Sequence, residues 1–190
     1  MNSKIRSGLI CAALALPSLS WAHVGADAGQ HHGLAEGLLH PLTGVDHLVA
    51  MVAVGVWSAL TARSAQWTAP LGFVAMLLLG ACLAAAGLSL PAVEPMIAVS
   101  VLVMGLLVAA RRVVPGTAGL ALVGTFALFH GAAHGAELSG AAALAGMVLT
   151  TVALQAAGLG LGTLMRRGHR GLSTLAGLGS AAWGLSLLWA

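Results

Sequence analysis

The chain has 190 residues, of which 59% are hydrophobic and only 7% are charged, whereas an average soluble domain carries about 25% charged residues. So little charge cannot cover a water-soluble globule, and we therefore expect most of the surface to face lipid. The formal net charge of +3 comes from few basic residues scattered over short segments, which argues against a nucleic-acid partner.

Residues 1–22 predict a cleavable secretory signal peptide. Lys4 and Arg6 precede an apolar run over 8–16, and small residues lead up to a cleavage position after Ala22. At about 1.5 Å per residue this run is too short to cross a bilayer comfortably, although an uncleaved transmembrane helix is the alternative.

Cleavage after Ala22 would leave His23 at the new N-terminus, where a free amine and an imidazole could chelate a metal ion together. We expect residues 23–37 to form a periplasmic segment that contains further histidines. Residues 38–190 would then form one all-α, polytopic membrane domain.

Six apolar stretches, separated by Pro, Gly and Arg, predict six transmembrane helices in this domain. Their expected ranges are 38–60, 69–89, 93–110, 113–135, 141–165 and 172–190. Small residues four positions apart, such as Gly80 with Ala84 and Ser180 with Gly184, predict close helix packing.

Charged residues orient these helices. If the mature N-terminus lies outside, the cytoplasmic loops hold every basic residue after the signal peptide, namely Arg63, Arg111, Arg112, Arg166, Arg167 and Arg170. The positive-inside rule thus predicts periplasmic termini at both ends of the mature chain and a multi-pass protein of the bacterial inner membrane. All carboxylates of the mature chain fall toward the outer side: Asp27, Glu36, Asp46, Glu94 and Glu137. Avoidance of the inner face explains Asp27 and Glu94, but not carboxylates gathered with histidines inside helices.

The first such cluster opens the predicted helix over 38–60. Pro41 suits the first helical position because its missing N–H would have no partner there. On a continuous helix His40, His47 and Met51 would share an arc of about 40°, with Asp46 on its flank. Two imidazoles and a carboxylate on one face predict half of a metal site, with Met51 as an auxiliary candidate.

The second cluster ends the predicted helix over 113–135. His130, His134 and Glu137 follow one another by four and then three residues, so they share one helix face within about 60°. Glu137 would be a third ligand, or would accept a hydrogen bond from a ligating histidine and so fix its tautomer. Gly131 and Gly135 leave room for another helix or an ion.

Imidazole and carboxylate donors without a thiolate favour Ni²⁺, Co²⁺ or Zn²⁺ over Cu⁺, and the donor set does not choose among these three ions. Elsewhere in the membrane domain, we interpret Gln155 as the donor or acceptor of an interhelical hydrogen bond rather than a ligand. His169 lies among arginines and is interpreted as a loop residue.

These motifs resemble those of the HupE/UreJ family of nickel permeases, which are encoded beside hydrogenase or urease genes. His40 with Asp46 and His47 fit its H-x5-D-H pattern, and the run from Phe129 to Glu137 fits its F-H-G-x-A-H-G-x-E pattern. The resemblance implies uptake of Ni²⁺, with Co²⁺ as a variation, no prosthetic group, and hydrogenase or urease maturation proteins as indirect partners. It implies functional roles for His40, Asp46, His47, His130, His134 and Glu137.

A Walker-type Gly-rich loop is missing from the sequence, so we expect uptake that is not driven by ATP within this chain. A permease of the kind that the resemblance implies would have no enzymatic activity. The main alternative is an intramembrane zinc hydrolase that uses His130 and His134. Gly131 argues against it, because an H-E-x-x-H motif has its glutamate there, although Glu137 could act as the base. A haem-binding subunit with axial histidines is a weaker alternative, since it leaves the carboxylates unexplained.

Overall fold

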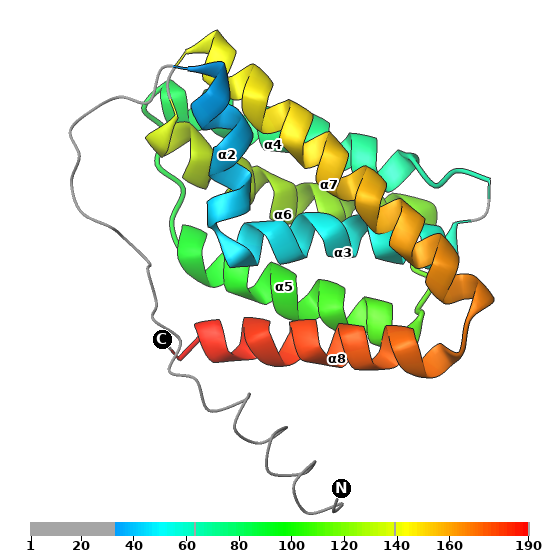
Figure 1. Ribbon diagram of the computed structural model, residues 1–190. Helices are drawn as coiled ribbons and strands as arrows, with labels where there is room; N and C mark the ends of the chain where they lie inside the picture. Colours follow the sequence, from blue (N-terminus) through cyan, green and yellow to red (C-terminus); the bar gives the residue numbers. More distant parts are fainter. Residues whose placement is uncertain (1–32, 63, 139, 190) are drawn as a thin grey trace, which may run out of the picture.

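The computed structural model describes residues 33–62, 64–138 and 140–189, and these ranges form an all-helical bundle (Figure 1). The predicted signal peptide, His23 and Arg63 lie outside the described residues. The helices are α2 (Leu34–Thr43), α3 (Val45–Thr61), α4 (Thr68–Ala85), α5 (Val93–Ala110), α6 (Gly116–Glu137), α7 (Ala141–Arg167) and α8 (Arg170–Leu187).

Four helices, α4 to α7, are long and apolar enough to cross a membrane, with mean hydropathies from 1.3 to 2.2. α2 and α3 together add a fifth candidate span if the bent pair crosses as one unit. α8 falls short because Arg170, Ser173 and Thr174 lower the hydropathy of its first turns. The described residues therefore support four to five spans, and the prediction of six is not confirmed.

The prediction of one helix over 38–60 is wrong, because α2 and α3 meet at 86° around Gly44. Gly44 has an extended backbone (φ −88°, ψ 108°) and is the N-cap of α3. Pro41 lies inside α2 rather than at a first helical position, and it cannot donate the helical hydrogen bond to the carbonyl four residues earlier, that of Gly37. The Thr43 hydroxyl donates to the carbonyl of His40 (2.7 Å) and satisfies a backbone group near the break.

Glycine lets four pairs of helices approach at backbone distance: α4 with α6, α5 with α8, α3 with α7, and α2 with α7. A Cβ atom at Gly80 would overlap the carbonyl oxygen of Leu128, and one at Gly184 would overlap the backbone nitrogen of Leu102. The close packing predicted for these small residues is therefore confirmed.

Charge separates along the bundle as the sequence predicts. At one end, the Arg166 guanidinium donates to the carbonyl of Ala59 (3.0 Å), and the Trp57 indole donates to the carbonyl of Arg112 (2.9 Å). The carboxylates of the described residues belong to the opposite ends of their helices: Glu36, Asp46, Glu94 and Glu137.

Candidate metal site

The break between α2 and α3 brings both histidine clusters together at one place in the bundle. The ring centroids of His47 and His134 lie 4.4 Å apart, and those of His47 and His130 lie 4.7 Å apart. His40, from α2, reaches His134 at 4.8 Å. The prediction that one continuous helix face carries His40, His47 and Met51 is therefore wrong. The two histidine motifs nevertheless meet in space, although they lie more than 80 residues apart in the sequence.

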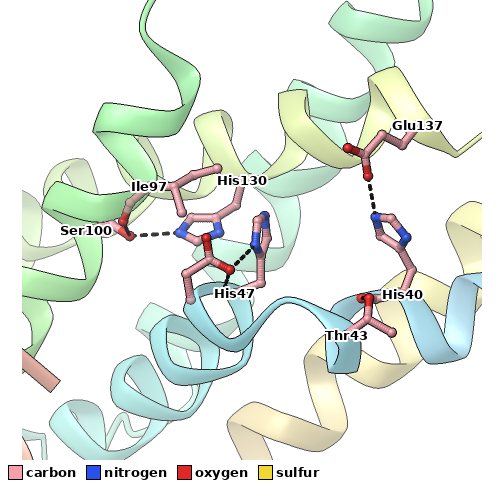
Figure 2. Close-up of polar contacts among 8 residues, drawn as sticks. His40, Thr43, His47, Ile97, Ser100, His130 and Glu137 are labelled. Atoms are coloured by element: carbon pink, nitrogen blue, oxygen red, sulfur yellow. Dashed lines mark hydrogen bonds and ion pairs between the residues drawn. The ribbon is translucent and has the colours of Figure 1, made fainter. Parts of the chain in front are cut away.

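The outer part of the cluster is accessible, and the inner part is dry. His40 Nε2 lies 2.9 Å from Glu137 Oε2, and the two side chains are 23% and 54% exposed (Figure 2). His130 and His134, one turn apart on α6, are 0% and 2% exposed. An ion arriving at Glu137 would therefore exchange water for imidazole as it moved inward.

Asp46 fixes the tautomer of His47. Its Oδ1 accepts from the backbone N–H of His47 (2.8 Å) and lies 2.9 Å from the ring Nδ1. A carboxylate oxygen only accepts, so Nδ1 carries the proton and Nε2 keeps its lone pair. This Nε2 atom is buried and has no hydrogen-bond partner among the described residues.

Ser100 of α5 fixes the tautomer of His130 in the same way. The Ser100 hydroxyl donates to the carbonyl of Ile97 (2.7 Å), so its oxygen must accept from His130 Nε2, at 2.8 Å (Figure 2). His130 Nδ1 therefore keeps its lone pair. Within the described ranges Nδ1 is buried without a partner.

His134 Nε2 is likewise buried without a hydrogen-bond partner in the described part of the chain, so three imidazole nitrogens of the cluster are unpaired there: His47 Nε2, His130 Nδ1 and His134 Nε2. The separations of 4.4 and 4.7 Å are those of rings in direct contact, so the three rings are close enough to reach one ion. No three His, Cys, Asp or Glu side chains of the described residues are already arranged to hold an ion, because the rings meet edge to face. Binding therefore requires the rings to turn.

Two other residues of the core bear on the sequence predictions. Met51, the auxiliary candidate, is fully buried one turn after His47. Gln155 is also fully buried, but neither of its amide atoms has a hydrogen-bond partner in the ranges that the structure describes. The predicted interhelical hydrogen bond of Gln155 is therefore wrong.

A pocket of about 320 Å³ opens beside the cluster and brings two carboxylates, Glu94 and Glu137, into one lining. The sequence interpretation assigned Glu94 merely to avoidance of the inner face. The structure places it with a candidate ligand, where two acids would raise the local concentration of cations.

Sequence reasoning missed Ser100 and Phe73, whose ring centroid lies 5.8 Å from that of His130. A signal for Ser100 was present, because it is a lone hydroxyl within the apolar stretch 93–110. The sequence does not single out Phe73, because an aromatic residue in an apolar helix is usually a packed core residue.

We expect Ser100→Ala to weaken metal binding by about 10–100-fold, the usual cost of losing the group that orients a histidine ligand. The matched control is Ser180→Ala, because the Ser180 hydroxyl bonds only within its own helix, to the carbonyl of Ala176. Calorimetric titration of both purified variants with Ni²⁺ compares their affinities. Equal affinities in the two variants would show that Ser100 does not orient His130.

Comparisons with known proteins assign the chain to a family. Residues 11–187 match the family model described as HupE / UreJ protein. The chain belongs to the HupE/UreJ family. This HupE/UreJ chain is 42% identical to Protein HupE of Rhizobium leguminosarum bv. viciae over 192 residues, which cover 98% of this chain and 97% of that protein. No solved structure matches it. With its long apolar helices, this member of the family is a multi-pass membrane protein.

Proposed function

We propose that this HupE/UreJ protein carries Ni²⁺, or Co²⁺, across the bacterial inner membrane into the cytoplasm, for hydrogenase or urease maturation. The observation that carries the proposal is the set of three buried imidazole nitrogens, on His47, His130 and His134, that lack partners among the described residues. Unpaired polar atoms are costly in an apolar interior and mark a site that a ligand completes. Imidazole is a preferred donor for both ions.

The proposed topology has a removed signal peptide, six spans and both mature termini in the periplasm. The bent pair of α2 and α3 would form the first span, so that the bend at Gly44 lies within the membrane. α8 would form the last, because it packs along α5 through Gly105, Gly177 and Gly184 and so follows its course. The arginines at one end and the carboxylates at the other support this orientation.

The route begins at the pocket of Glu94 and Glu137 and continues through His40 to the buried imidazoles. A divalent ion that crosses an inside-negative membrane gains about 4.6 kcal/mol per 100 mV, so the membrane potential alone suffices to drive uptake. The chain therefore needs to supply only a path that replaces the hydration shell of the ion.

The hydrolase alternative loses support at Gly131. A Cβ atom there would overlap the carbonyl oxygen of Leu77 on α4, so no side chain fits at the position where an H-E-x-x-H motif has its glutamate. The two carboxylates nearest the histidines are already engaged, Asp46 Oδ1 with His47 and Glu137 Oε2 with His40.

The test is metal content by mass spectrometry in cells that express the protein and are supplied with Ni²⁺, Co²⁺ and Zn²⁺ together at submicromolar levels. We expect Ni²⁺ or Co²⁺ to rise above the level of cells with an empty vector. Accumulation of none of the three ions, with folded protein in the membrane, would contradict the proposal, and so would accumulation of Zn²⁺ alone.

A further inference from the structure

Buried polar atoms without partners extend beyond the histidines, along α7. Thr151 and Gln155 are fully buried and lie one turn apart, so they share one face of α7. Neither the Thr151 hydroxyl nor the amide of Gln155 has a hydrogen-bond partner within the described residues. Apart from the indole nitrogen of Trp183 on α8, every such atom in these ranges belongs to this pair or to the three histidines.

The helix register places the pair on the inner side of the histidines. α3 and α7 run side by side in the same direction, since Gly55 abuts the backbone carbonyl of Gln155, and Gly162 abuts that of Val56 (Figure 1). Gly55 lies between the levels of Gln155 and Leu159, and Gly158 abuts the carbonyl of Val52, so Gln155 is level with about Ala53 on α3. Ala53 follows His47 by six residues, or roughly 9 Å toward the arginine end.

The polar groups farther along this path are already engaged. The Ser58 hydroxyl donates to the carbonyl of Gln66 (2.7 Å), and the Trp57 indole is bonded to Arg112. Met51 lies on α3 between the level of His47 and that of Gln155, and is fully buried. Polar side-chain atoms that lack hydrogen-bond partners among the described residues therefore extend from the imidazoles to Gln155, through a core that is otherwise apolar.

We propose that Thr151 and Gln155 form a second, inner ion-binding station, which takes the divalent ion from the imidazoles on its way to the cytoplasmic end. This inference rests on the proposed function. The amide and hydroxyl oxygens are neutral ligands that bind a dipositive ion more weakly than three imidazoles do. Weak binding suits transit, because an ion must leave each station as readily as it enters.

The test compares Gln155→Leu with the wild type, both purified and reconstituted in liposomes. We expect Ni²⁺ influx to fall at least tenfold, while equilibrium Ni²⁺ binding to the imidazoles stays within twofold of wild type. We expect thermal stability to be unchanged or higher, because leucine replaces an unpartnered buried amide with an apolar group of similar size. Stability and transport should thus move in opposite directions.

A second pair of variants keeps the test independent of Gln155. Thr151→Val preserves shape and should slow influx, whereas Thr163→Val should not, because the Thr163 hydroxyl bonds only to the carbonyl of Leu159 in its own helix (2.8 Å). Wild-type influx in Gln155→Leu would overturn the inference. A loss of stability, Ni²⁺ binding and influx together in Gln155→Leu would also overturn it, because that pattern would mean that the Gln155 amide only supports the fold. If the wild type itself imports no Ni²⁺, the proposed function falls, and this inference falls with it.

Discussion

Replacing His47 with alanine should abolish Ni²⁺ accumulation, while replacing His169 should leave it at the wild-type level. The His47 ring contacts both His130 and His134 and carries the Nε2 lone pair that Asp46 orients. Loss of a group that merely orients a ligand costs about 10–100-fold in affinity, so loss of the ligand should cost at least about 100-fold.

His169 is the matched control because it is exposed at the N-cap of α8, at the arginine end. Metal content of cells at equal protein abundance gives the comparison. We expect His47→Ala to reach the membrane normally, because the backbone N–H of residue 47 still donates to Asp46 Oδ1 after the truncation and no partner is lost by the buried Nε2 atom. Wild-type accumulation by this variant would exclude His47 from the route.

Gly131→Ala should destabilise the protein by about 3 kcal/mol, since a methyl group forced into packed backbone strains both helices. Its Cβ atom would overlap the carbonyl of Leu77, and α4 would have to move away from α6 beside His130. Gly160→Ala is the control, because nothing lies within 4 Å of a Cβ atom there and the residue is exposed. Alanine there should be neutral or slightly stabilising.

The thermal midpoint of each purified glycine variant in detergent gives the comparison. A clear decrease for Gly131→Ala and none for Gly160→Ala is the expected pattern. Equal midpoints would mean that α4 and α6 do not pack at backbone distance.

Most helices of the fold can be predicted from the sequence, because Pro, Gly and Arg interrupt its apolar runs. The predicted range 93–110 coincides with α5, and 141–165 differs from α7 by two residues. Pro41 and Gly44 are local signals of a break, but its angle could not be predicted, because it depends on tertiary contacts such as the hydrogen bond from the Thr150 hydroxyl to the carbonyl of Leu38 on α2 (2.7 Å).

The candidate site was predictable as a set of residues but not as an arrangement. Spacing alone identifies His130 and His134 as neighbours on one face, whereas the pairing of His40 with Glu137 needs the fold. The engagement of Ser100 and the unpartnered amide of Gln155 are equally invisible in sequence, because a residue type does not reveal whether a buried polar group finds a partner. The roles of the six predicted ligands remain predictions.

The proposed function requires that this chain alone moves Ni²⁺ down the membrane potential through its imidazole cluster. Purified protein in liposomes, with an inside-negative potassium diffusion potential and a nickel-sensitive dye inside, gives the direct test. We expect influx without nucleotide in the wild type, little influx when the potential is collapsed, and none in His47→Ala. Folded wild-type protein that binds Ni²⁺ but admits none under this potential would contradict it.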